Sequence, residues 1–179
     1  RRFDEARQAF QNVITLYQND PVVLESFVQV ANCWRRLDQP AMAKGKGYFS
    51  VGETVVSPDN KLLAWAEDTV GRRQYVLRVK NIATGEVLSD QVENVEPNIV
   101  WADDNRTLFY VDKDPVTLLS KRVKSHVLGT PTAEDRLVYE ESDDSFYMGL
   151  GRSRSDKYIC ILLESTVSNE QRCAPAAKP

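Results

Sequence analysis

Apolar and polar positions alternate along two stretches of the chain that follow nearly the same pattern. The first runs from Val55 to Asp68 and the second from Val100 to Val111. In each, an apolar run leads into a cluster rich in Asp and Asn, and an alternating apolar run follows, which is typical of a strand, a tight turn and a second strand. A weaker third copy has Phe146–Leu150 before its polar cluster and Tyr158–Leu163 after it. The pattern therefore predicts hairpins that recur at roughly the 40–45 residues of a β-propeller blade.

The alternation from Tyr48 onward also predicts the other strands of each repeat. The first repeat would use residues 53–56, 62–67, 74–80 and 86–89, the second 98–101, 107–112, 121–127 and 136–139, and the third 146–150, 158–163 and 170–173. The predicted fold class is mainly β, with about two and a half four-stranded β-propeller blades over residues 48–179. A closed propeller has about 4–8 blades, so we expect further blades outside this sequence.

Residues 1–44 follow a helical period instead. Phe3, Ala6 and Phe10 begin a series of apolar residues three and four positions apart, and Asp20-Pro21 marks the end of one helix and the start of the next. This pattern predicts a short α-helical hairpin before the strands, with a second helix over about 21–37 and a third helical start at 41–43. The hairpin resembles a fragment of a tetratricopeptide repeat, a unit that normally needs neighbouring repeats to cover its apolar face.

Gly45-Lys46-Gly47 is predicted to be a linker, because the hydrophobic period changes from helical to alternating across it. The predicted domains are thus a helical fragment at 1–44, a linker at 45–47 and a partial propeller at 48–179. Since only the linker joins the two parts, we expect them to be separate cooperative units with few contacts between them.

Composition excludes several classes of protein. Of the 179 residues, 42% are hydrophobic and 27% charged, which is typical of a globular chain. The net charge is −3 and no basic patch is present, so no nucleic-acid partner is expected. No apolar run approaches the roughly 18 residues of a membrane span, and the first residues lack the apolar core of a signal peptide, so no membrane partner is expected. A cytoplasmic location is predicted.

The three cysteines are few and widely spaced. Cys33 falls on a helical apolar face, Cys160 in a strand, and Cys173 near the end of the chain. No metal or redox motif has these spacings, and we expect buried free thiols.

The segment from about residue 47 to 173 resembles the propeller domain of oligopeptidase B, in the prolyl oligopeptidase family of serine peptidases. Eight segments carry the resemblance in the same order: Ser57–Asn60, Ala66–Asp68, Arg72–Tyr75, Asn94–Pro97, Val100–Asp104, Pro115–Leu119, Gly129–Pro131 and Val138–Glu141. The resemblance implies that such a propeller is joined to an α/β-hydrolase catalytic domain and limits access to an active site that cleaves peptides after Lys or Arg.

The catalytic machinery of that family is not expected in this sequence. A serine nucleophile on an α/β-hydrolase fold needs a G-x-S-x-G elbow, and Gly149-Leu150-Gly151-Arg152-Ser153 does not match it. His126 is the single histidine and lies mid-strand, which favours a structural or surface role. The acidic pairs Asp103-Asp104 and Asp143-Asp144 fall in turns and are interpreted as solvated turn caps. We therefore predict no catalytic, cofactor or metal residues, and no peptide hydrolysis by this chain alone.

Arg72 and Arg73 are the candidate functional residues. They follow a turn, so one side chain should face a blade and the other the rim. Pairing with Glu67 or Asp68 is the structural interpretation, and contact with a catalytic domain across a cleft is the functional one. The expected partners are thus an α/β-hydrolase domain or further propeller blades.

Two other interpretations of the whole chain stay open. In one, the helical repeat and the blades form a protein-interaction scaffold; in the other, two unrelated pieces are joined without a function of their own. A partial propeller would also leave apolar faces uncovered, and self-association through them is expected. The candidate residues on those faces are Trp65, Trp101, Phe109, Tyr110, Tyr158 and Ile161.

Overall fold

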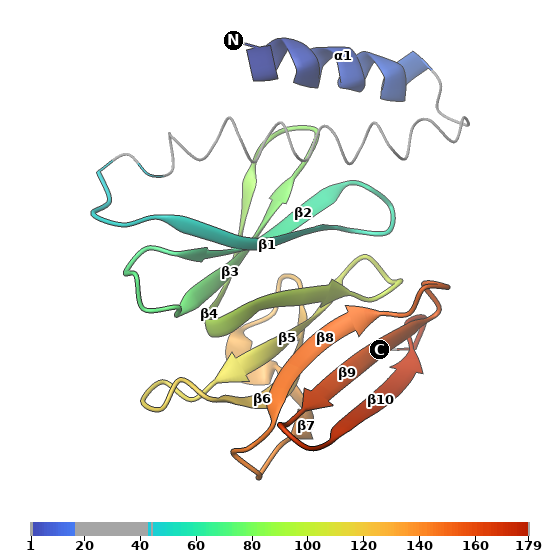
Figure 1. The fold of residues 1–179 in the computed structure, drawn as a ribbon. Helices are drawn as coiled ribbons and strands as arrows, with labels where there is room; N and C mark the ends of the chain where they lie inside the picture. The colour runs from blue at the N-terminus through green and yellow to red at the C-terminus, as the bar shows by residue number, and fades with distance from the viewer. Residues whose placement is uncertain (1, 17–42, 44, 179) are drawn as a thin grey trace.

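A computed structural model describes residues 2–16, 43 and 45–178 of the chain (Figure 1). Helix α1 (Arg2–Leu16) precedes ten strands. The predicted second helix, at 21–37, lies outside the described residues, and of the third helical start at 41–43 only Ala43 is described, as a helical residue.

Each predicted strand segment falls within an observed strand, apart from single residues at strand ends, and the mainly β fold class is confirmed. The strands are β1 (Ser50–Val56), β2 (Leu62–Asp68), β3 (Tyr75–Asn81), β4 (Val87–Trp101), β5 (Thr107–Lys113), β6 (Ser120–Val127), β7 (Arg136–Glu140), β8 (Tyr147–Arg152), β9 (Tyr158–Glu164) and β10 (Asn169–Pro175), and a 3₁₀ turn, η1 (Thr132–Glu134), precedes β7. All neighbours pair antiparallel, in a seven-stranded sheet ordered β1 to β7 and a three-stranded sheet ordered β10-β9-β8.

Strand β4 differs from the prediction, which placed two separate strands at 86–89 and 98–101. It is one strand of 15 residues, and Val95 pairs with Tyr75 on β3 as well as with Asp112 on β5. Pro97 stands just after this exchange of partners, where the ladder with β5 is irregular between Val95 and Ile99, so its missing N–H is tolerated. The two predicted blades are therefore continuous in hydrogen bonding, and the blade number stays a prediction.

The predicted repeat is present in the backbone of its turns. Each of the three hairpins that connect β1 to β2, β4 to β5 and β8 to β9 contains one residue in the left-handed region: Asn60 (φ 61°), Asn105 (φ 59°) and Asp156 (φ 57°). Asn and Asp tolerate this conformation better than other side chains do. The polar clusters in the sequence are thus three copies of one turn.

One member of each acidic pair caps a turn, as predicted, whereas Asp103 and Asp144 form ion pairs with Arg152 and Lys121. Asp104 accepts hydrogen bonds from the amides of Arg106 and Thr107 at 2.9 and 2.8 Å, and Asp143 accepts one from the amide of Ser145 at 2.9 Å.

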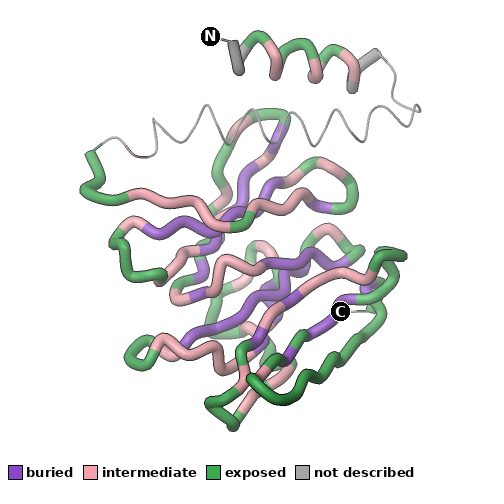
Figure 2. The backbone as a smooth tube through the Cα atoms, viewed as in Figure 1, coloured by how far each residue is buried: buried purple, intermediate pink, exposed green. Residues whose placement is uncertain are grey.

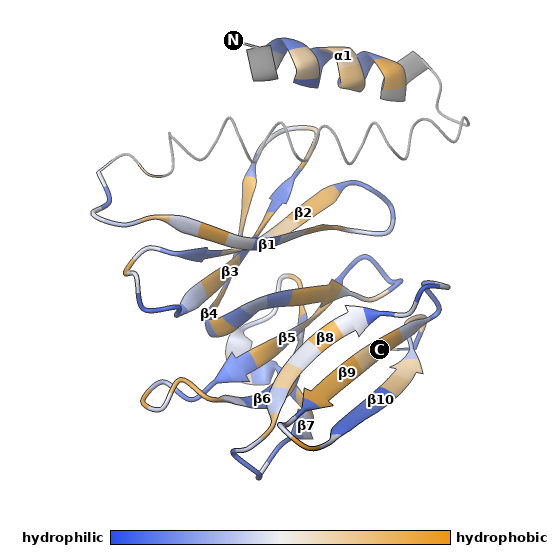
Figure 3. Cartoon of the chain, in the orientation of Figure 1, coloured by the Kyte–Doolittle hydropathy of each residue, from blue (hydrophilic) through white to orange (hydrophobic). Residues whose placement is uncertain are grey.

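Two apolar cores lie on opposite faces of β4 and β5, whose burial Figure 2 shows. One core is shared with β2 and β3 and contains Ile99, Trp101, Leu108 and Tyr110. The other core is shared with β8 and β9 and contains the alternate residues Val100 and Phe109. Because both of its faces are covered, β5 is buried at all seven positions. Figure 3 shows hydrophilic colour at the arrowhead of β5, so the buried positions of this strand include polar side chains.

The expectation of uncovered apolar faces is wrong for five of the six residues that it named. The exposed fractions of Trp65, Trp101, Phe109, Tyr110 and Ile161 are all 8% or less, whereas Tyr158 is 45% exposed. The two cores described above cover four of these five side chains. Self-association stays a prediction but loses this motivation.

Helix α1 contacts the β part of the chain. Phe10 packs against the small cluster formed by Leu63 and Ile82, with Val56 beside it. The few contacts expected between the two parts thus include an apolar one, while the predicted boundary at 45–47 stays a prediction.

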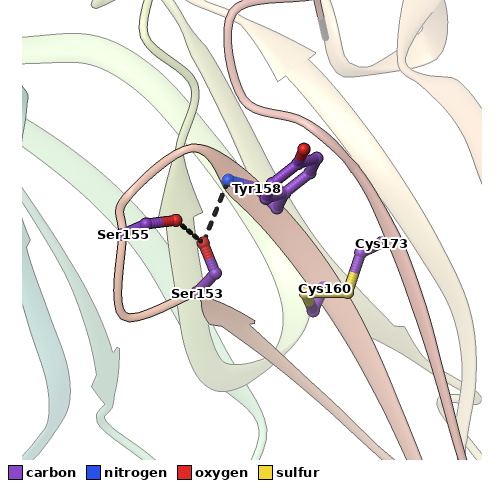
Figure 4. The surroundings of a disulfide bond; sticks show 5 residues. All are labelled: Ser153, Ser155, Tyr158, Cys160 and Cys173. Carbon is purple, nitrogen blue, oxygen red and sulfur yellow. Dashed lines mark hydrogen bonds between the residues drawn. A yellow bond between two sulfur atoms is a disulfide. The ribbon is translucent and has the colours of Figure 1, made fainter.

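Cys160 and Cys173 form a disulfide, which corrects the expectation of free thiols (Figure 4). The two residues are direct partners in the ladder between β9 and β10, and this register brings their side chains together. Cys33 lies outside the described residues.

No helix among the described residues is long and apolar enough to cross a membrane.

We expect Gly52→Ala to destabilise the fold. A Cβ at this position of β1 would lie 2.3 Å from the Cβ of Pro97, so the backbones of β1 and β4 would have to separate. Overpacking of this kind costs about 1–3 kcal/mol of unfolding free energy, measurable by urea denaturation. Gly151→Ala is the matched control, because a Cβ there on strand β8 meets nothing within 4 Å. Equal stability of the two variants would contradict the close approach.

We also expect the disulfide to be detectable without mutation. Non-reducing peptide mapping should recover residues 160 and 173 in one cross-linked fragment, with Cys33 alkylated as a free thiol. The Cys160→Ser/Cys173→Ser double variant should lose about 3 kcal/mol of unfolding free energy, the typical value for a loop of this length. Full alkylation of all three cysteines in unreduced, denatured protein would show that the bond does not form.

Candidate interdomain surface

Three segments meet at one end of the seven-stranded sheet. They are the loop 69–74 between β2 and β3, the loop 114–119 between β5 and β6, and residues 94–97 of β4. Gln74 Nε2 donates to the carbonyl of Pro115 at 3.4 Å, and Ser120 Oγ donates to Glu96 Oε1 at 3.1 Å. These contacts join residues 24 to 41 positions apart into one surface, which we call the loop end.

A buried lysine ties the loop end together. The side chain of Lys113 is only 3% exposed, and its Nζ lies 3.0 Å from Glu96 Oε1 and 3.0 Å from the carbonyl oxygen of Arg73. A buried ammonium group is tolerated only when such partners replace its hydration. Lys113 therefore fixes the backbone of Arg73 against β4.

Asp68 shapes the first loop. Its side chain is buried and accepts hydrogen bonds from the amides of Val70, Gly71 and Arg73 at 2.8, 2.9 and 2.8 Å. Gly71 and Arg73 both have positive φ, at 82° and 58°, and the carboxylate holds the chain in this uncommon conformation. Burial raises the pKa of Asp68, but the backbone hydrogen bonds lower it by more, so it lies below the ordinary value.

The second loop is built in the same way. Asp114 accepts hydrogen bonds from the amides of Val116 and Thr117 at 2.9 and 2.8 Å, and these bonds lower its pKa. Leu118 has a positive φ of 61°. An aspartate at the end of a strand thus organises each of the two loops.

Arg72 and Arg73 project from this framework into solvent. Both are exposed, and among the described residues neither guanidinium has an ion-pair partner. The pairing with Glu67 or Asp68 that the structural interpretation required is not formed. Glu67 is paired with Arg78 at 2.8 Å instead, and Asp68 is occupied by backbone amides. Val70 and Val116, 64% and 87% exposed, add apolar area to the same two loops.

A second feature is a hollow of about 640 Å³ along the first strand of each repeat, namely β1, the C-terminal half of β4, and β8. Glu53 Oε2 accepts from Asn98 Nδ2 and from the amide of Ile99, both at 3.0 Å, and Asn98 Oδ1 accepts from the amide of Leu150. These bonds connect the three strands side by side, and Glu53, Ile99 and Leu150 also line the hollow.

The remaining candidates have structural roles. Ser153 Oγ lies in the hairpin after β8, where it accepts a hydrogen bond from the amide of Tyr158 at 3.2 Å (Figure 4). His126 is fully buried between two aspartates, in line with the structural role expected of it and not with a surface role. In the part of the chain that the structure describes, no three His, Cys, Asp or Glu side chains are grouped to hold a metal.

Residues 13–179 match the family model of the N-terminal β-propeller domain of prolyl oligopeptidase. The chain belongs to this family. The match starts at residue 13, inside the segment predicted to be a tetratricopeptide-like fragment, so that interpretation is not supported.

Individual relatives are peptidases. The chain is 68% identical over 143 residues to dipeptidyl aminopeptidase BI from Pseudoxanthomonas mexicana, covering 80% of this chain and 20% of that protein. The structure of oligopeptidase B from Leishmania major is similar with a TM-score of 0.73 and 30% identity, over 78% of this chain and 19% of that one. Oligopeptidase B from Trypanosoma brucei follows with a TM-score of 0.71 and 28% identity, over 79% and 19%. The chain thus spans about a fifth of the length of these relatives.

We expect Asp68→Asn to weaken the loop end. Asn keeps one acceptor oxygen but loses the charge and the second acceptor, so the unfolding free energy should fall by about 1–3 kcal/mol. Because the pKa of Asp68 in the folded chain lies below its ordinary value of 3.8, its contribution is complete above that pH and is lost as the pH falls through the folded value. Urea denaturation at pH 7 and at pH 3 should therefore show a smaller difference between variant and parent at pH 3. A constant difference would mean that the charge of Asp68 is not what stabilises the loop.

Proposed function

We propose that this chain is part of the access-limiting propeller of a serine peptidase that acts on short peptides. The observation that carries the proposal is the family match over residues 13–179, together with relatives that are peptidases. The catalytic serine, histidine and aspartate would lie in an α/β-hydrolase domain elsewhere in a longer protein. The hollow beside β1, β4 and β8 would face the route by which peptides reach that domain.

The loop end is proposed as the surface that contacts the catalytic domain. Support comes from its chemistry: among the described residues, Arg72 and Arg73 have no ion-pair partner, they lie on a loop capped by Asp68, and the same surface exposes Val70 and Val116. Apolar residues ringed by charges are typical of surfaces that bind another protein domain. Carboxylates on the catalytic domain would pair with the two guanidinium groups.

The interaction-scaffold alternative has lost its main support. It depended on a helical repeat at 1–44 that would extend into further repeats. The family match begins within that segment at residue 13.

Two cleavage specificities are candidates. The resemblance to oligopeptidase B favours cleavage after Lys or Arg within a peptide, and the similarity in fold to its structures supports this. The name of the 68% identical relative favours release of dipeptides from a free N-terminus instead. The two differ in whether the substrate needs a free amino group.

A pair of substrates tests the function and separates the two specificities. The longer protein that contains this chain would be given an arginyl amide whose N-terminus is blocked, and the same amide on an unblocked dipeptide. Hydrolysis of both, abolished by a serine-directed inhibitor, supports cleavage after Arg, and hydrolysis of only the unblocked form supports dipeptide release. No hydrolysis of either would overturn the proposed function.

Arg72→Ser/Arg73→Ser in the longer protein should reduce kcat/KM by about tenfold or more, if two charge-assisted contacts of at least about 1 kcal/mol each are lost. Raised salt should reduce the difference between parent and variant, because it screens exposed charges. Arg154→Ser is the matched control, because Arg154 is equally exposed but lies in the β8–β9 hairpin, outside the loop end. Equal losses in the two variants would argue against a specific contact at Arg72 and Arg73.

A further inference from the structure

Another hollow, of about 370 Å³, opens between β7 and β10, the strands that end the two sheets. We call it the rim hollow. Its floor is apolar, because Phe109 on β5, Val123 on β6 and Ile161 on β9 line it. These three side chains belong to the core shared with β8 and β9, so the rim hollow reaches the edge of that core. Its volume lies within the range of about 300–1,000 Å³ that is typical of small-molecule sites.

The charged side chains that line the rim hollow are all basic. They are Arg136 on β7, Arg172 on β10 and Lys178, which follows β10. Among its lining residues, as the structure describes them, none is an aspartate or a glutamate. The hollow beside β1, β4 and β8 differs, because three acidic and two basic side chains line it. The rim hollow therefore combines an apolar floor with a single sign of charge.

Arg172 is held in place by contacts on both edge strands. Its guanidinium group stacks on the ring of Tyr139 on β7, 4.7 Å from the ring centre, and its Nε atom lies 2.7 Å from Glu170 Oε1. Tyr139 is fixed in turn, because its hydroxyl donates to Glu141 Oε2 at 2.6 Å. The stacked pair thus forms a preorganised wall of the rim hollow, and Glu170 balances the charge of Arg172.

The other two cations are not balanced in this way. Arg136 and Lys178 are both exposed, and in the described part of the chain neither forms an ion pair. Glu141 and Glu170, the carboxylates beside the stacked pair, do not line the rim hollow. Arg136 and Lys178 are therefore available to an anion, and their charges are complementary to one that enters between the two strands.

The apolar floor selects among anions. Phosphate and sulfate have no apolar surface, so they would leave the floor of the rim hollow in contact with water. A carboxylate joined to an apolar chain or ring matches both parts of the site. Its two oxygens fit the paired N–H groups of a guanidinium, and its body removes the apolar floor from water.

We propose that the rim hollow binds small carboxylates with an apolar body. The carboxylate group lies at Arg136 and Lys178, and the body covers Phe109, Val123 and Ile161. Two kinds of molecule share this chemistry, namely a medium-chain fatty acid and a short peptide that ends in an apolar residue. The site is independent of the proposed peptidase function, because it uses none of the residues of the loop end.

Calorimetric titration of the longer protein that contains this chain tests the ligand class. Octanoate and N-acetylphenylalanine represent the two kinds of ligand, and the corresponding amides are their uncharged controls. Each acid that binds should do so at least about tenfold more tightly than its amide, because the amide cannot form charge-assisted hydrogen bonds. Binding of octanoate alone indicates a fatty acid, and binding of N-acetylphenylalanine alone indicates a peptide end. Equal binding of acid and amide would overturn the proposal.

Two variants test whether the acid that binds does so in the rim hollow. Arg136→Ser/Lys178→Ser removes the two unpaired cations and should weaken binding by about tenfold or more. Arg106→Ser/Arg154→Ser is the matched control, because these arginines are also exposed and do not line the rim hollow. The control should bind as the parent does.

Ala174→Phe tests the apolar part without changing any charge. Ala174 lines the rim hollow from the exposed strand β10, so a phenyl ring there should occupy the space of the ligand and also weaken binding. Unchanged binding in Arg136→Ser/Lys178→Ser, or an equal loss in its control, would overturn the proposal. Failure of both acids to bind the parent would overturn it as well, and is the result expected if another segment of the longer protein covers the rim hollow.

Discussion

The burial of β5 and of the C-terminal end of β4 on both faces is the constraint on which the rest of the structure depends. Neighbouring residues on these strands point into different cores, so Val100 and Trp101 stabilise two separate contacts between layers. A sheet that is covered on both faces has few solvated positions, and its polar groups must either reach the strand ends or find partners in the interior. The loop end is the first outcome, and buried His126 between Asp90 and Asp135 is the second.

The same constraint accounts for what could be predicted from the sequence. Strand positions follow from local alternation and turn residues, and both patterns are present in the sequence from Val55 to Leu163. The continuity of β4 was missed because Pro97 resembles a break between strands. Its effect on pairing depends on β3 and β5, which lie on either side of the strand.

Contacts that depend on register could not be inferred from local pattern alone. Asp90 and Asp135 are 36 and 9 residues from His126, and only the packing of one predicted blade on the next brings all three together. The disulfide is an intermediate case. The Ser165–Ser168 turn is closed by a 2.8 Å backbone hydrogen bond, and counting outward from it along both strands pairs Cys160 with Cys173. The register of this hairpin therefore indicates the disulfide, whereas the number and spacing of the cysteines do not. A disulfide is typical of oxidising compartments, and it weighs against the predicted cytoplasmic location, which stays a prediction.

The loop end and the cluster around His126 differ in what their charged side chains contact, and this difference supports different roles for them. At the loop end, buried Asp68 and Lys113 use their charges to hold backbone groups, which leaves Arg72 and Arg73 exposed and available to another domain. Around His126, the side chains of Asp90 and Asp135 find their partners within the fold. The first arrangement suits recognition between domains, since exposed cations lose little on pairing. The second suits the packing of neighbouring strands, because a buried charge is tolerated only when partners replace its hydration.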